Sequence, residues 1–180
     1  KTIDPQSGER VTIRVPTTGE NIKFFVTYQV GWMYMRYFFW NFVGRQNDVQ
    51  GHRGPLDGNW LCGIDAIDSA RLGSQDDLPA HMKNNAARNV YYFLPLLLGL
   101  LGFFFQMIRQ RKDWLVVSLL FFFTGLAIVL YLNQYPLQPR ERDYAYAASF
   151  YAFAIWVGFG ALAIFDALSK TIGAKGGAAI

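Results

Sequence analysis

Residues 90–108 read VYYFLPLLLGLLGFFFQMI and contain no charged side chain. At about 1.5 Å of rise per residue, a helix over this stretch reaches across the roughly 30 Å hydrocarbon core of a bilayer. The stretch contains Pro95, Gly99 and Gly102. Such residues are tolerated in membrane helices, because neighbouring helices satisfy the backbone groups that lose their partners. The stretch therefore predicts a transmembrane helix over 90–108.

Two further uncharged blocks follow, at 114–139 and 144–165. They predict spans at about 114–132 and 144–168, and the short loop 109–113 makes the first two spans a tight helical hairpin. In the third span, small residues recur every fourth position, which lets helix backbones approach closely inside a membrane. Such residues are also common in these helices without any packing role. The residues concerned are Ala148 and Ala152, then Ala154 and Gly158.

The composition agrees with a membrane protein. The 180 residues are 52% hydrophobic and 17% charged, against roughly 25% charged in a soluble domain. The net charge of +4 is spread over loops and forms no basic stripe, which argues against a nucleic-acid partner. Cys62 cannot form an internal disulfide, and His52 and His81 are isolated from other ligand residues, so we expect no metal and no cofactor.

The aromatic segment 24–43 permits two interpretations. On a helical wheel Gln29 and Arg36 share one side, while the other side carries Thr27, Gly31 and Asn41. Polar residues on two sides favour a helix that lies at the membrane interface or packs among other helices. A fourth span is the alternative.

These segments together predict an all-α polytopic membrane protein. Its divisions are a polar segment 1–23, the aromatic helix 24–43, an extracytoplasmic loop 44–89, a transmembrane region 90–168 and a flexible Gly-rich tail 169–180. Gly and Pro residues punctuate the loop. A short helix is expected within 63–72, with Asp65 and Asp68 on a solvated face or in a turn.

The orientation follows from basic residues in short segments. The loop 109–113 has three basic residues and one acid, and the tail adds Lys170 and Lys175, so both are expected in the cytoplasm. The loops 44–89 and 133–143 then face the opposite side. In a bacterial inner membrane that side is the periplasm.

Two polar clusters follow aromatic or apolar helices and supply the candidate site residues. The first contains Asn41, Arg45, Gln46 and Asp48, and the second contains Asn133, Gln134, Arg140, Arg142, Asp143 and Tyr144. Arginine binds phosphate through paired donors, so Arg45, Arg140 and Arg142 are candidates for a phosphate clamp at the outer membrane surface. The alternative is structural, with Arg140 and Asp143 forming an ion pair at a helix entrance.

The same clusters carry a resemblance to a family. The runs FFVTYQVGWMYMRYFFWNFVGRQND (24–48) and YLNQYPLQPRERDYAYAASFYAFAIW (131–156) resemble DUF2723, a family of large membrane proteins that includes animal transmembrane O-mannosyltransferases. The resemblance covers about 4–168 and includes DGNWLCGIDAID, RNVYYFLPLLLGLLGFFFQ and FFFTGLAIVLYLNQ.

The resemblance implies a GT-C-like fold and a glycosyltransferase, of family 117, that moves a sugar, mannose, from a polyprenyl-phosphate donor to Ser or Thr of translocated proteins. It also implies that the catalytic acid lies in a first outer loop ahead of Lys1, so the catalytic residues of this chain are unknown. The expected partners are the lipid bilayer, the lipid-linked sugar and an acceptor protein. Two other functions agree with the sequence: a transporter or flippase for the lipid-linked sugar, and a noncatalytic membrane assembly subunit.

Overall fold

The computed structural model describes residues 2–3, 10–11, 15–51, 53–136 and 142–177, with side chains from Val15 to Thr171 apart from the gaps. Arg140 lies outside these residues. Most of the described chain is helical, which confirms the all-α class. The strands are short antiparallel pairs of two residues each: β1 (Thr2–Ile3) with β2 (Arg10–Val11), and β3 (Gly44–Arg45) with β4 (Asn89–Val90).

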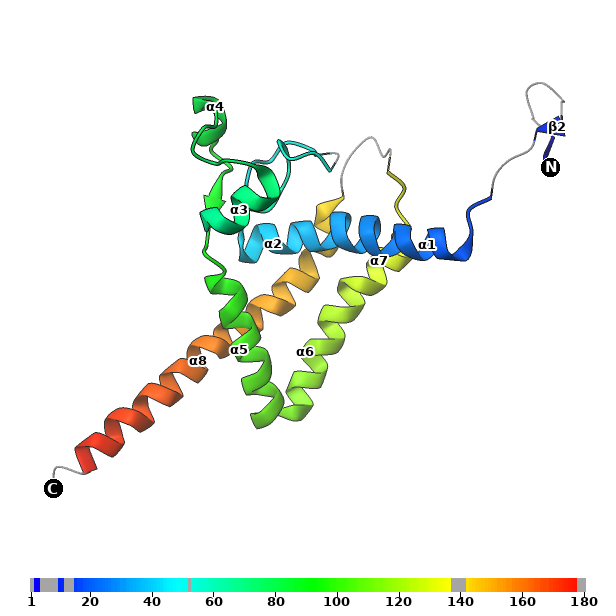
Figure 1. The fold of residues 1–180 in the computed structure, drawn as a ribbon. Coiled ribbons are helices and arrows are strands. Elements are labelled where there is room, and N and C mark those ends of the chain that lie inside the picture. Colours follow the sequence, from blue (N-terminus) through cyan, green and yellow to red (C-terminus); the bar gives the residue numbers. More distant parts are fainter. Residues whose placement is uncertain (1, 4–9, 12–14, 52, 137–141, 178–180) are drawn as a thin grey trace.

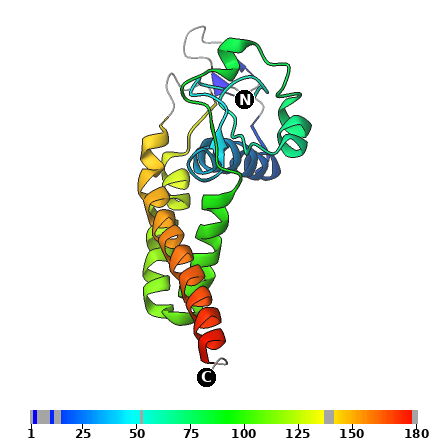
Figure 2. The same cartoon turned by 90° about the vertical axis from the view of Figure 1, so that its left-hand side faces the viewer.

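One continuous helical rod opens the main body. It consists of α1 (Thr18–Phe24), the π-helical segment η1 (Phe25–Met35) and α2 (Arg36–Phe42). Thr17 and Glu20 cap its start, with the Thr17 backbone N–H donating to the Glu20 carboxylate over 2.8 Å. The rod lies across one end of the other long helices (Figures 1 and 2). This is the arrangement of a docked helix.

The two polar sides of the rod have different surroundings. Gln29 and Arg36 are buried, whereas Thr27, Gly31 and Asn41 are exposed. The two buried side chains have different partners, however, because Gln29 contacts the end of α7 (Leu126–Leu132) and Arg36 contacts the outer loop. The rod is therefore packed on one side along most of its length.

The predicted helical hairpin is present. It pairs α5 (Leu94–Arg109) with α6 (Arg111–Thr124), and α7 continues α6 after a break at Gly125. The expected start of the first span at Val90 is wrong. Val90 belongs to β4, and the backbone at Tyr92 and Phe93 is not in the right-handed helical conformation. Tyr92 and Phe93 have φ of 52° and 60°. Pro95, which lacks a backbone N–H, then lies in the first turn of α5.

Two helical stretches in the described part of the chain are long and apolar enough to cross a membrane. They are Arg111–Leu132, with 22 residues, and Asp143–Thr171, with 29. They point to membrane association. The first of the three predicted spans is shorter: α5 has 16 residues, or about 24 Å of helix.

The last helix is longer than the sequence predicts. The 3-10 turn η2 (Asp143–Tyr146) leads into α8 (Ala147–Gly177). Residues 169–177, expected to be a flexible tail, are therefore helical. The backbone hydrogen bonds of α8 continue past Gly173, where the sequence pattern suggests a stop.

Glycines bring α5 and α8 into close contact. A methyl group on Gly102 would overlap the backbone of Trp156 and Gly160, and one on Gly160 would overlap the carbonyl group of Leu98. The predicted small-residue face is therefore only partly right. Ala152 is buried, but Ala148, Ala154 and Gly158 are exposed, and nothing lies within 4 Å of a methyl group placed on Gly158.

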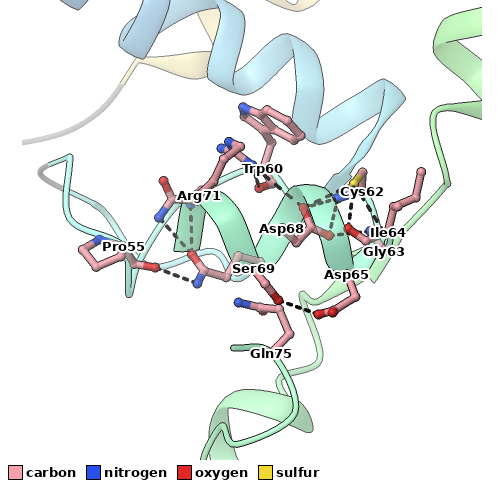
Figure 3. A network of polar contacts seen from close by, with 12 residues as sticks. Pro55, Trp60, Cys62, Gly63, Ile64, Asp65, Asp68, Ser69, Arg71 and Gln75 are labelled. Carbon is pink, nitrogen blue, oxygen red and sulfur yellow. Dashed lines mark hydrogen bonds and ion pairs between the residues drawn. The ribbon is translucent and has the colours of Figure 1, made fainter. Parts of the chain in front are cut away.

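The outer loop is joined to the helices through the short β3–β4 ladder. It contains α3 (Asp65–Leu72), which confirms the predicted short helix, and α4 (Ala80–Lys83). Asp68 is 1% exposed, so the prediction that it lies on a solvated face is wrong. Its carboxylate accepts hydrogen bonds from the backbone N–H groups of Cys62 and Gly63, at 3.1 and 2.7 Å (Figure 3). Arg71 Nη1 lies 3.9 Å from the Asp68 carboxylate, and the centre of the Arg71 guanidinium lies 3.3 Å from the centroid of the Trp60 ring.

Candidate functional site

A polar pocket of about 380 Å³ lies where α2, the β3–β4 ladder and the start of α8 meet. It unites residues from both polar clusters of the sequence, although these clusters are about a hundred positions apart. Asn41 and Arg45 come from the first cluster, and Asp143 and Tyr144 come from the second. The other lining residues are Tyr37, Trp40, Asn89, Tyr91, Ala147 and Phe150.

Arg45 is the basic residue of this pocket and is held at two points. Its backbone N–H donates to the Asn89 side-chain oxygen over 3.0 Å, and its Nε donates to the Ala87 carbonyl oxygen over 2.9 Å. It forms no ion pair with any residue in the described ranges, and its terminal nitrogens donate no hydrogen bond there. A guanidinium fixed through Nε keeps its outer N–H groups available for an anion.

Trp40 contacts two arginines. The centre of the Arg45 guanidinium is 5.4 Å from the indole ring, and that of Arg36 is 5.0 Å from it. Arg36 is 2% exposed and also stacks on Trp32 and Tyr37, while its Nη1 donates to the Gly58 carbonyl oxygen over 3.0 Å. Both guanidinium groups are within cation–π distance of the indole, and this contact stabilises the wall beside Arg45.

The remaining polar groups come from α2 and η2. The Asn41 amide nitrogen donates to the Tyr37 carbonyl oxygen over 2.8 Å, which fixes the orientation of its side chain. Asp143 lies in the first turn of η2, and it and Tyr144 are exposed. The pocket therefore combines a guanidinium, a carboxylate, two amides and several aromatic rings.

The other predicted site residues lie elsewhere. Gln46 is buried in the outer loop, where its side chain binds Asn59 and the Pro55 carbonyl group, and this role is structural. Asp48 is exposed on the same loop and does not line the pocket. Arg142 is exposed just before η2 and does not line it either. Of the three arginines in the predicted clamp, Arg45 lines the pocket and Arg142 does not, while Arg140 lies outside the described residues.

Asn133 and Gln134 form a separate amide cluster beneath η1. The Gln29 amide nitrogen donates to the Asn133 side-chain oxygen over 2.9 Å and to the Gln134 carbonyl oxygen over 3.0 Å. Gln134 is 2% exposed, and its own amide has no partner within the ranges that the structure covers. The cluster joins the rod to the end of α7.

An apolar cavity of about 390 Å³ flanks α2 on its other side. Met35, Phe38 and Phe39 form its wall on the rod, and the opposite walls come from α5, α6 and α8. Ser118 on α6 also lines it, and its buried hydroxyl has no partner in the described part of the chain. The polar pocket and the apolar cavity share the helices α2 and α8 as walls.

Sequence reasoning missed several lining residues. Tyr37, Trp40 and Phe150 resemble ordinary interfacial or core aromatics, and Asn89 and Tyr91 belong to a segment predicted to be loop and span. Only the pairing of Gly44 with Val90, and of Arg45 with Asn89, brings these segments to the pocket. A signal in the sequence was available in Asn89 and Tyr91, polar-tipped residues on either side of Val90 at the start of the apolar run.

Comparison of the chain with family models, with curated proteins and with solved structures gives no match in any of the three. The class defined by the fold is therefore that of a helical protein with two helices able to cross a membrane and a polar pocket at one end of them. Within the described residues no three His, Cys, Asp or Glu side chains gather as a metal site would require.

Proposed function

We propose that the chain forms the donor-binding part of a membrane glycosyltransferase. In this proposal a sugar, mannose, passes from polyprenyl phosphate to the hydroxyl group of Ser or Thr in a translocated protein. The observation that carries the proposal is the pocket in which Arg45 and Asn41 meet Asp143 and Tyr144. The resemblance of the same two segments to the DUF2723 family gives the reaction.

The chemistry assigns roles to the pocket residues. Transfer breaks the bond between sugar C1 and the phosphate oxygen, forms a bond from C1 to the acceptor oxygen, and passes the acceptor proton to a base. Arg45 binds the phosphate and stabilises the charge that it gains on leaving. Asp143 accepts hydrogen bonds from hydroxyl groups, and the aromatic walls contact the sugar ring. No residue of this chain is assigned as the base.

The lipid part of the donor suits the apolar cavity beside the pocket. That cavity is lined by aromatic and aliphatic side chains of four helical segments. The cavity and the polar pocket share α2 and α8 as walls, and we assign the isoprenoid chain to the cavity and the phosphate to Arg45 in the pocket. The apolar chain and the phosphate of the donor therefore each have a chemically matched surface.

We also propose the membrane setting. The pocket and the loop 44–89 face the periplasm of a bacterial inner membrane, and α5, with α6–α7 and α8, forms three spans. A helix as short as α5 is accommodated by local thinning of the bilayer or by its flanking residues. The basic residues Arg109, Arg111, Lys112 and Lys170 support this orientation, because they follow the apolar runs at the end opposite the pocket.

The test compares two pocket variants with a control on the same loop. Arg45→Gln should reduce retention of radiolabelled polyprenyl-phosphate mannose by the purified full chain, by about tenfold or more. Asp143→Asn should spare retention but reduce transfer to a Ser/Thr peptide by the complete enzyme. Arg53→Gln removes the same charge from an exposed arginine outside the pocket and should change neither.

Two results would contradict the proposal. Equal retention by Arg45→Gln and Arg53→Gln would remove the phosphate site. Normal glycosylation in cells whose chain carries both Arg45→Gln and Asp143→Asn would remove the transferase function. Movement of the labelled lipid between leaflets without any glycosylated product would instead favour the flippase alternative.

A further inference from the structure

A second groove, of about 410 Å³, lies between α5 and α8 at the end of the bundle farthest from the polar pocket. Its walls are apolar, and Leu101 and Ile108 are exposed along it. One end carries three charged side chains. The lining residues are Leu101, Phe105, Ile108, Arg109, Ala163, Asp166, Ala167 and Lys170.

The charged residues mark one level along both helices. From Leu94 to Ile108 α5 has no charged residue, and from Ala147 to Phe165 α8 has none. The first charge of α5 is Arg109 and the first of α8 is Asp166, and these two form an ion pair of 2.7 Å. The apolar parts of the two helices therefore end together. In a bilayer this level is the boundary between hydrocarbon and head groups.

The three charges leave an excess of positive charge at that boundary. Lys170 Nζ lies 2.8 Å from the same Asp166 oxygen that Arg109 contacts, so two cations share one carboxylate. Neither cation has another acceptor within the described residues, and each keeps unused N–H donors. Arg111 and Lys112 begin α6 after a single intervening residue and add to the local charge.

From this arrangement we infer a binding site for an anionic phospholipid of the bilayer. The phosphate binds Arg109 and Lys170, and one acyl chain lies along Leu101, Phe105 and Ala163. The groove offers an apolar surface for the acyl chain and cations for the phosphate. They lie in the order that a bilayer lipid requires, since the apolar walls are on the hydrocarbon side of the cations. The inference rests on the membrane setting proposed above but not on the proposed transferase activity, because it involves no residue of the polar pocket.

The competing explanation is an ion pair that only fixes α5 to α8. The variant Asp166→Asn distinguishes the two explanations, because it keeps both cations and removes the carboxylate that they share. A lipid site then binds anionic lipid more strongly, whereas a purely structural ion pair gives no gain in lipid binding.

The measurement is native mass spectrometry of the full chain in detergent, with phosphatidylglycerol and phosphatidylcholine added in competition. We expect Arg109→Gln with Lys170→Gln to reduce the preference for phosphatidylglycerol by about tenfold, and Asp166→Asn to raise it. The matched control is Lys23→Gln with Lys83→Gln, which removes two exposed charges from the other end of the molecule and should leave the preference unchanged.

The proposal is overturned if the Arg109/Lys170 variant keeps the preference of the control. Circular dichroism establishes whether each variant is folded. If the double variant is unfolded, Asp166→Asn decides alone: a raised preference supports the lipid site, and an unchanged or lowered one overturns it.

Discussion

The indole nitrogen of Trp156 donates a 2.8 Å hydrogen bond to the side-chain oxygen of Gln106, and both residues are buried between α8 and α5. This is a polar link inside an apolar helix pair, and Phe103 and Phe121 pack against the same indole. A hydrogen bond of this kind fixes the register of two helices, because the alternative is an unpaired polar group in an apolar environment.

Removing one partner of this bond should reduce stability. Trp156→Phe leaves the Gln106 oxygen unpaired, and we expect a loss of about 1–3 kcal/mol in the free energy of unfolding. Denaturant unfolding in detergent micelles measures it. Combining Trp156→Phe with Gln106→Leu should cost less than the sum of the single changes. Strict additivity would show that the bond contributes nothing.

The glycine contact between α5 and α8 gives a second prediction. Gly102→Ala places a methyl group against the Trp156 backbone, which cannot move without separating the helices. We expect a loss of about 1–3 kcal/mol, by the same unfolding measurement. Gly158→Ala, on the open face of α8, is the control and should be neutral or stabilising by up to about 1 kcal/mol. Similar effects of both changes would refute the close contact.

The buried thiol gives a prediction about pH. Burial raises the pKa of Cys62, and the hydrogen bond and negative charge of Asp68 raise it further. The thiol therefore stays protonated through neutral pH. A raised pKa favours folding below the ordinary value of 9.0, and this contribution is lost as the pH rises through the raised value.

Alkylation kinetics test this state of Cys62. Iodoacetamide should react slowly with the native chain between pH 7 and 9 and quickly after unfolding. Asp68→Asn should accelerate the reaction in the folded chain, because it removes a nearby negative charge. Ala70→Cys in a Cys62→Ser background provides an exposed thiol on the same loop for comparison. Equal native rates for both thiols would contradict the burial.

A fourth prediction concerns the arginine stack, and it depends on the proposed phosphate site. Trp40→Leu removes the ring that both Arg36 and Arg45 contact, and we expect retention of polyprenyl phosphate to fall about fivefold. Trp32→Leu is the matched control, since Trp32 also stacks on Arg36 but does not line the pocket. An equal loss in both variants would mean that general destabilisation, not the position of Arg45, is responsible.

Local patterns in the sequence predicted the helices well. Uncharged blocks identified α6–α7 and α8, and the short basic loop predicted the hairpin with α5. The helix in the outer loop was found from its flanking glycines. These features depend on residues that are close together in the chain, so they can be predicted from one sequence.

Features that join distant segments were not predictable in the same way. The β3–β4 ladder involves two residues on each strand, too few for an alternating pattern. The ladder nevertheless includes Val90, so the helix begins later than predicted, and it brings Asn89 next to Arg45. The glycines in the α5–α8 contact were visible as Gly99 and Gly102, but their partner Gly160 could be chosen only once the crossing point was known.

The β3–β4 ladder has a consequence for the modularity of the chain. Gly44 and Val90 are paired neighbours, so everything between them enters and leaves the helical body through one narrow neck. At Gly44, φ is 134°, and a methyl group there would meet the backbone of Leu61 and Asn89, so the neck has no room for a side chain. The outer loop is nevertheless not independent of the helices, because Arg36 of the rod donates to the Gly58 carbonyl oxygen and Phe39 packs against Trp60. A tight turn between Arg45 and Asn89 would preserve the path of the chain but remove the Gly58 acceptor from buried Arg36, so an exchanged loop has to supply a new one.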